Sequence, residues 1–208
     1  SSKLIVGQSI IEEKINNLNF EISMQSFFQT NPKCAELLYL KVINYLKEST
    51  FKDDSYILDL FCGTGTITQL ISSNINKKVI GVDIVKSAIT DAKANVKKNN
   101  FKNVEFICAD VGKFLLEHPK YQNKIHTIVI DPPRAGITPK SLRKVIRLNA
   151  KKIIYVSCNP STQARDLATL TEMGYKVEKF SLVDQFPHTA HIESIMLFSR
   201  SLVKTVHN

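Results

Sequence analysis

From about residue 55 onward, short apolar runs rich in β-branched residues alternate with segments of helical length and periodicity. The predicted strands are residues 56–59, 78–83, 104–109, 125–131, 152–157, 177–182 and 194–199. Helical segments such as 84–99 and 139–148 separate the first five strands, whereas only a loop separates the last two. Strands joined through helices form a parallel sheet covered on both faces, and strands joined by a loop pair antiparallel. The pattern therefore predicts an α/β fold with a doubly wound seven-strand sheet and a C-terminal antiparallel hairpin at one edge.

Two segments precede this sheet. Residues 32–47 carry apolar side chains at helical spacing and predict an amphipathic helix. Residues 1–31 predict an irregular or strand-like approach segment. The chain has no repeat or low-complexity tract, and its seven glycines and seven prolines do not cluster into a linker. We therefore expect the 208 residues to form one domain, with an approach segment (1–31) and a main body (32–208).

The charge balance and the lengths of the apolar runs indicate which kinds of partner and location to expect. The 28 Lys and Arg exceed the 19 Asp and Glu, and the net charge of +9 favours a polyanionic partner, although lysines on a solvated surface give the same balance. No apolar run reaches the roughly 20 residues that cross a bilayer, so we expect no membrane association. Residues 1–6 include no Met and are too short for a signal peptide, which indicates a fragment of a longer protein.

The four cysteines, Cys34, Cys62, Cys108 and Cys158, form no CxxC pair and have no metal-ligand spacing with the five histidines. A disulfide-stapled secreted domain is disfavoured at this size and cysteine density. We therefore expect a reducing cytoplasm, no metal ion or iron–sulfur cluster, and at least one thiol free for chemistry.

The five predicted parallel strands all end in polar side chains. These are Asp59, Asp83, Asp110, Asp131 and the pair Ser157-Cys158. Because ligands of open α/β sheets bind at the carboxyl ends of the strands, this edge is the predicted site.

The turn after the first strand predicts one half of that site. Gly63 lets the backbone approach a ligand closely, but Thr68 stands where a dinucleotide fingerprint has its third glycine. A carboxylate at Asp83 suits the two hydroxyls of a ribose, and Asp110 suits an adenine amino group. Each acid alone also fits a helix cap. Together they predict an adenosine pocket, and its acid-rich lining favours the cationic S-adenosylmethionine over NAD.

The fourth and fifth strand ends predict the reacting half. Asp131-Pro132-Pro133-Arg134 lacks the aromatic residue with which adenine amino-methyltransferases end a similar tetrapeptide, and the Arg134 guanidinium suits a phosphate, a base carbonyl or a carboxylate. Cys158 precedes a predicted helix at 161–170, so the helix dipole is expected to lower its thiol pKa and favour thiolate. The alternative is a buried structural cysteine.

The loop 184–193 adds further polar groups. Glu193 directly precedes the last strand and could reach the same cleft, and His188 and His191 compete with it for the role of base. A metal site from the two histidines and Glu193 has no supporting ligand pattern elsewhere in the sequence.

These motifs resemble a known family. Asp59-x-Phe61-Cys62-Gly63-x-Gly65, followed by Asp83, Asp110 and the Asp131 tetrapeptide, resembles the class I (Rossmann-like) S-adenosylmethionine-dependent methyltransferases. With Ser157-Cys158-Asn159-Pro160, the loop 184–193 and residues 25–32, the chain resembles the RNA uracil-C5 methyltransferases over roughly residues 22–200. That family makes 5-methyluridine in tRNA or large-subunit rRNA.

The resemblance implies roles for individual residues. Cys158 is the nucleophile that adds to C6 of uracil, and Glu193 is the base that removes the C5 proton. Phe27 stacks on the target uracil, although an ordinary core phenylalanine beside Phe28 is the alternative. The implied S-adenosylmethionine pocket is lined by Gln29, Phe61, Thr66, Asp83, Asp110 and Asp131. Thr66 departs from the Asn often found at its position in the family.

Two other functions stay open at this point. RNA cytosine-C5 methyltransferases use the same thiol chemistry but typically carry a second cysteine in the loop after the fourth strand, which is absent here. A non-catalytic cofactor-binding or RNA-binding module would be expected to lack the nucleophile or the base. Full-length members of the family usually carry an N-terminal RNA-binding domain, so we expect this chain to be a monomeric catalytic domain.

Overall fold

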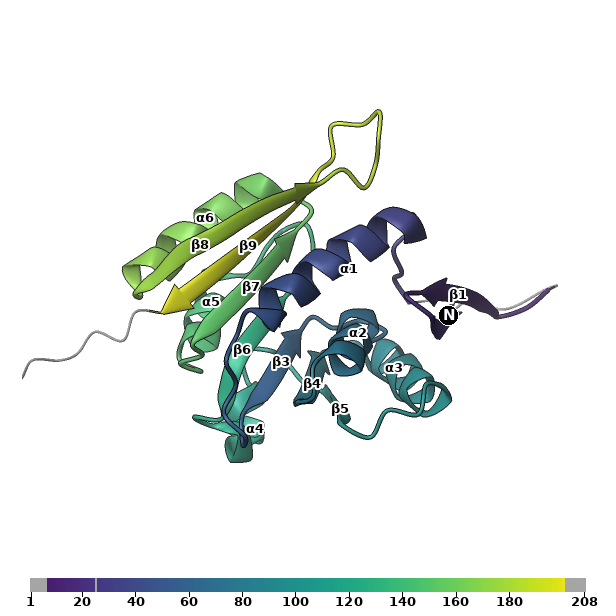
Figure 1. Ribbon diagram of the computed structural model, residues 1–208, viewed down its shortest axis with the longest axis horizontal. Coiled ribbons are helices and arrows are strands. Elements are labelled where there is room, and N and C mark those ends of the chain that lie inside the picture. The colour runs from purple at the N-terminus through teal and green to yellow at the C-terminus, as the bar shows by residue number, and fades with distance from the viewer. Residues whose placement is uncertain (1–6, 25, 201–208) are drawn as a thin grey trace, which may run out of the picture.

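The computed structural model describes residues 7–24 and 26–200, which form two sheets and the helices around them (Figure 1). The larger sheet has seven strands in the order β5-β4-β3-β6-β7-β9-β8. Their bounds are Tyr56–Leu60 (β3), Lys78–Asp83 (β4), Val104–Cys108 (β5), Ile125–Ile130 (β6), Lys152–Ser157 (β7), Tyr175–Val183 (β8) and Glu193–Arg200 (β9). The strands β3 to β7 run parallel, and β9 is antiparallel to both β7 and β8. The predicted seven-strand doubly wound fold and its C-terminal hairpin are confirmed.

Six helices and one short 3-10 helix lie in the described residues. Their bounds are Pro32–Lys47 (α1), Thr66–Asn74 (α2), Lys86–Lys98 (α3), Phe114–Glu117 (α4), Pro119–Tyr121 (η1), Pro139–Ile146 (α5) and Pro160–Glu172 (α6). Helix α3 begins two residues later than predicted. The reason is that Val85 is extended and donates its N–H to Asp83 Oδ1 at 2.8 Å, so the chain does not become helical before Lys86.

The sheet separates two apolar cores. Side chains alternate along a strand, so each strand contributes every second residue to each face. One core contains α1 and α2 with Ile57, Val79, Val129, Ile154, Val156, Ile195 and Leu197. The other contains α4, α5 and α6 with the intervening residues, such as Leu58, Ile128 and Ile153. Figure 1 shows α1 and α2 on one side of the sheet and α5 and α6 on the other.

The approach segment contains a hairpin, β1 (Ile10–Ile15) paired with β2 (Leu18–Ser23), in agreement with its strand-like prediction. Side chains one turn apart along α3 and its C-cap bond the backbone of alternate β2 residues. The three pairs are Asp91 with Ser23, Asn95 with Glu21, and the C-cap Asn99 with Asn19. Asn95 accepts from the Glu21 N–H at 2.8 Å and donates to its carbonyl at 3.0 Å. Four helical residues rise about 6 Å and two strand residues about 6.7 Å, so the two repeats match.

Candidate functional site

Four reactive or acidic side chains lie on the same face of the sheet, at its carboxyl edge. Each stands two positions from an apolar residue of the core under α1 and α2, and alternation therefore directs all four toward those helices. The pairs are Asp59 with Ile57, Asp131 with Val129, Cys158 with Val156, and Glu193 with Ile195. Because β9 is antiparallel, its first residue meets the ends of the parallel strands.

The strand register brings Cys158 and Glu193 together. Ser157 of β7 pairs with Ser194 of β9 as the last rung of that antiparallel ladder. Cys158 and Glu193 are the next residues outward on the two strands, and neighbours across such a rung lie about 5 Å apart between Cα atoms. The Glu193 carboxylate also contributes to the raised pKa of the Cys158 thiol, which agrees with this placement.

Three of these side chains, Asp59, Asp131 and Glu193, form an acidic cluster, and each has a pKa above that of an ordinary carboxyl. Burial raises the pKa of Asp59 to about 7, against the hydrogen bond that Thr68 Oγ1 donates to its Oδ2 at 2.5 Å. Burial, Glu193 and Asp59 raise the pKa of Asp131 to about 8. Burial also raises the pKa of Glu193. The other Asp59 oxygen, Oδ1, is buried with no protein partner. An orphaned acceptor among crowded acids suits a cationic ligand that carries N–H donors.

The structure corrects the predicted ionisation of Cys158. The helix dipole was expected to lower its thiol pKa, but burial, Glu193 and Asp131 together raise it above the ordinary value. The nearby Arg134 opposes them only in part. Burial of the thiol, together with the two neighbouring acids, outweighs the partial positive charge of a helix N-terminus. The alternative of a structural cysteine sealed in the core is also wrong, because Cys158 is only half-buried.

The turn after β3 is built for close approach. Phe61, Gly63 and Gly65 all have positive φ, at 63°, 51° and 79°, and a Cβ at Gly65 would lie 2.3 Å from the Phe106 ring. Positive φ is costly for a residue such as Phe61 and clusters at ligand sites. Asp83 accepts the Gly63 N–H at 2.9 Å, which fixes its carboxylate beside this turn.

The other predicted pocket residues differ in exposure. Asp110 is half-buried after β5. Thr66 is 6% exposed at the start of α2, with its hydroxyl 3.5 Å from that of Thr64. Gln29 is half-buried, and it accepts a short hydrogen bond from Gln185 Nε2.

Two residues without a predicted role lie beside predicted ones: Gln185 contacts Gln29, and Tyr39 lies near the three buried acids. Gln185 is fully buried, and its Oε1 has no protein partner. Asn31 donates to the Gln185 carbonyl at 3.0 Å, which ties the β8–β9 loop to the segment before α1. Tyr39 of α1 is buried, and Asp131, Asp59 and Glu193 all raise its pKa. The sequence offered Tyr39 only as one apolar position of an amphipathic helix, whereas Gln185 stood in the polar loop 184–193.

The residues predicted to meet RNA are exposed. Phe27 is 74% exposed, while Phe28 packs against Phe20 with ring centroids 5.8 Å apart. The core alternative for Phe27 is therefore wrong. Arg134 is exposed, with Nη2 3.5 Å from His191 Nδ1, and its carbonyl accepts from Asn159 Nδ2 at 3.3 Å. This bond joins the loop after β6 to the loop that carries Cys158.

The candidates for the base are separated by burial. His188 and His191 are exposed, whereas Glu193 is 4% exposed inside the acidic cluster. Across the described residues, no group of three His, Cys, Asp or Glu is arranged to hold a metal ion. In the same part of the chain, no helix combines the length and hydrophobicity needed to cross a membrane.

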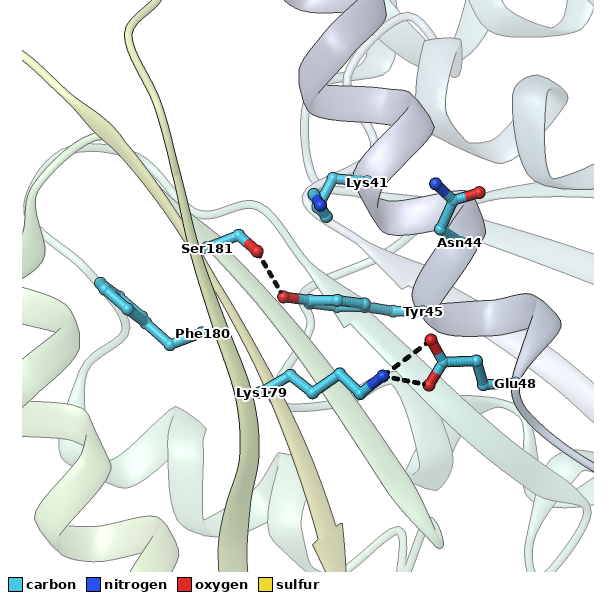
Figure 2. Close-up of a pocket in the computed structure, with 7 residues that line it drawn as sticks. All are labelled: Lys41, Asn44, Tyr45, Glu48, Lys179, Phe180 and Ser181. Atoms are coloured by element: carbon cyan, nitrogen blue, oxygen red, sulfur yellow. Dashed lines mark hydrogen bonds and ion pairs between the residues drawn. The ribbon is translucent and has the colours of Figure 1, made fainter.

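A separate groove of about 620 Å³ lies between α1 and β8 (Figure 2). Four of its polar side chains are paired: Tyr45 and Ser181 share a 2.6 Å hydrogen bond, and Lys179 pairs with Glu48 at 2.7 Å. None of the strand-end acids lines this groove. We therefore place the candidate site at the strand ends.

The raised pKa of Asp59 predicts how stability depends on pH. Between its ordinary pKa of 3.8 and about 7, the folded protein keeps a proton that the unfolded chain releases, so the free energy of unfolding falls as pH rises through this window. Asp131 acts in the same direction up to about pH 8. We expect Asp59→Asn, which cannot ionise, to lose less stability between about pH 5 and pH 8 in urea denaturation. The exposed Asp53→Asn is the control, and an unchanged pH profile in Asp59→Asn would contradict the assignment.

Comparisons with known proteins agree with this geometry. Residues 1–201 match the family model described as tRNA (Uracil-5-)-methyltransferase. An uncharacterized RNA methyltransferase of Clostridium acetobutylicum is 45% identical over 199 residues, which cover 96% of this chain and 42% of the relative. A second, from Fusobacterium nucleatum, is 43% identical with the same coverage.

Among solved structures, the tRNA (uracil-54, C5)-methyltransferase of Pyrococcus abyssi, in complex with S-adenosyl-L-homocysteine, aligns with a TM-score of 0.74 at 31% identity. The alignment covers 93% of this chain and 45% of that one. The chain thus spans less than half the length of the proteins it matches. With a family model matched over nearly its whole length, the chain belongs to the tRNA (uracil-5-)-methyltransferase family.

Proposed function

We propose that this protein transfers a methyl group from S-adenosylmethionine to C5 of a uridine in structured RNA, either tRNA or large-subunit rRNA. The observation that carries the proposal is the register of β7 and β9, which sets Cys158 and Glu193 on neighbouring strands at the acidic edge of the sheet. Family membership supports the same chemistry. Residues 32–208 would form the methyltransferase domain, with 1–31 as its approach segment.

The residues present fit S-adenosylmethionine. When bound, it supplies a methyl group activated by a positively charged sulfur. Asp59 and Gln185 each offer a buried oxygen without a protein partner, which suits a ligand rich in donors. Asp83 stands 20 residues after Gly63, where a ribose is expected, and Asp110 follows the next strand. The half-buried Gln29, Phe61 and Asp131 and the buried Thr66 would complete the pocket.

The chemistry needs both Cys158 and Glu193. Uracil C5 is a weak nucleophile until a thiolate bonds to C6, which moves the C5=C6 electron pair toward C5 and O4. C5 then takes the methyl group. Glu193 removes the C5 proton, the C5=C6 bond reforms and the C6–sulfur bond breaks, so that Cys158 leaves as thiolate.

Because the pKa of the Cys158 thiol is raised, the groups around it must help to remove its proton. The Cys158 proton must leave before C6 is attacked, and one of the neighbouring carboxylates whose charge acts on this thiol would accept it. The positive charge of the bound cofactor would also favour thiolate. The exposed Arg134 would stabilise negative charge on the uracil oxygen or hold a phosphate. The exposed Phe27 would stack on the flipped base.

Methyl transfer into RNA tests the proposal directly. The full-length protein is incubated with labelled S-adenosylmethionine and transcripts of tRNA or rRNA, and the digested nucleosides are separated by mass spectrometry. We expect label in 5-methyluridine from U-containing RNA and none from transcripts in which the uridines are absent. Label in 5-methylcytidine would support the cytosine-C5 alternative, and binding of the cofactor without transfer to any RNA would support a non-catalytic module.

A further inference from the structure

A buried polar bridge lies behind Cys158 and Glu193, on the opposite face of the sheet. Gln163 of α6 is fully buried, and its two amide atoms bond two different strands. Its Nε2 donates to the Tyr155 carbonyl of β7 at 2.8 Å, and its Oε1 accepts from Ser194 Oγ of β9 at 2.7 Å. Ser194 Oγ also lies 3.3 Å from the Ser157 carbonyl.

The bridge lies at the outer end of the β7–β9 ladder, where the strand pairing is expected to open most easily. The inner rungs of β7 and β9 are apolar pairs such as Ile153 with Phe198 and Ile154 with Leu197. The outermost rung, Ser157 with Ser194, is polar, and beyond it the chain enters the loop 184–192, most of which is exposed. Strand ends beside exposed loops open more easily than strand centres. A side chain that bonds both strands at this end holds the rung closed.

A purely structural role would not require these residue types. A buried amide costs free energy unless both of its ends are bonded, and an apolar side chain of similar size would fill the same space without that requirement. Both ends of the Gln163 amide are bonded, one to β7 and the other to β9. Cys158 directly follows β7, and Glu193 is the first residue of β9.

We infer that Gln163 and Ser194 are positioning residues that hold the Glu193 carboxyl opposite the Cys158 thiol. The inference rests on the proposed function, in which Cys158 adds to C6 and Glu193 resolves the adduct. Neither positioning residue touches the substrate, because both side chains face α6 rather than the acidic cluster.

The first test separates the two chemical steps in the full-length protein. In Gln163→Met and Ser194→Ala, Cys158 still adds to C6, but a displaced Glu193 removes the C5 proton slowly. We expect 5-methyluridine formation to fall about 10- to 100-fold, while the covalent RNA–protein adduct persists. Tyr175→Phe is the matched control, because it removes a different buried hydrogen bond, 2.7 Å to the Ala150 carbonyl, away from the site.

A second test needs no turnover. The rate at which iodoacetamide alkylates Cys158, followed by mass spectrometry across pH, reports the ionisation of its thiol. If the bridge holds Glu193 close to Cys158, displacing Glu193 lowers the thiol pKa, and both variants shift the alkylation profile toward lower pH. Glu193→Gln is expected to cause the same shift. Adding Gln163→Met to Glu193→Gln should then cause no further shift. Tyr175→Phe keeps the wild-type profile.

Failure of the positioning role of Gln163 and Ser194 and failure of the proposed methyltransferase activity give different results. Wild-type ratios of adduct to product and unshifted alkylation profiles in both variants overturn the positioning role. A wild-type protein that forms neither adduct nor 5-methyluridine overturns the proposed function, and the alkylation profiles then still decide whether Gln163 and Ser194 place Glu193.

Discussion

Replacing Cys158 by Ala is expected to abolish formation of 5-methyluridine, a loss of several orders of magnitude, while binding of S-adenosylmethionine stays intact. Without the sulfur, C5 of uracil has no covalent activation, and no other thiol can substitute. Of the other cysteines, Cys62 is packed against the core around Phe106, Cys108 is exposed at the end of β5, and Cys34 belongs to the first turn of α1 rather than to a strand end. Cofactor binding is measured by calorimetry and methyl transfer by nucleoside analysis.

The matched control for this variant is Cys108→Ala, which removes an exposed thiol near the predicted adenosine pocket and should retain turnover. Measurable turnover in Cys158→Ala would show that the sulfur is not the nucleophile. Loss of cofactor binding in the same variant would show that Cys158 serves the pocket instead.

Replacing Glu193 by Gln is expected to convert a transient adduct into a stable one. The amide has nearly the same shape but cannot accept the C5 proton, so the methylated base stays bonded to Cys158. The substitution also removes the first of the two charges that raise the Cys158 thiol pKa, so addition to C6 should be as fast as in the wild type or faster. Product release should fall about 10²- to 10⁴-fold, the usual contribution of a general base.

The measurement is a denaturing gel with labelled RNA, in which Glu193→Gln gives a band that survives denaturation. The exposed His188→Asn tests the competing base, and Asn suits the positive φ of 69° at that position. If His188→Asn accumulates the adduct while Glu193→Gln turns over normally, the roles assigned here are reversed.

Much of the fold follows from sequence because its signals are local. Periodicity predicted α1 over the residues it occupies and located all seven strands of the large sheet to within two residues at either end. The rule that ligands bind at the carboxyl ends of parallel strands also pointed to Asp59 and Asp131, and the position of Glu193 directly before the last strand pointed to the same cleft. The shift of the α3 start depended on one side chain, Asp83, which bonds the Val85 N–H.

The features that the sequence could not give depend on contacts between distant segments. The hydrogen bonds between α3 and β2 join residues more than 60 positions apart, and no local sequence pattern predicts them. The pKa of Cys158 was predicted in the wrong direction. The helix N-terminus was visible in the local sequence, whereas the burial of the thiol and the approach of Glu193 and Asp131 depend on the folded chain. Tyr39 joins the acidic cluster only because α1 packs over the strand ends.

A covalent bond between Cys158 and C6 of uridine underlies every step proposed for this protein, and peptide mapping of the Glu193→Gln complex detects that bond. The complex is digested with trypsin and ribonuclease, and the linked peptide is sequenced by tandem mass spectrometry. We predict one cross-linked peptide, which contains Cys158 bonded to a uridine nucleotide that carries one additional methyl group. A link through Cys34, Cys62 or Cys108, a nucleotide without the methyl group, or no cross-linked peptide would contradict the account.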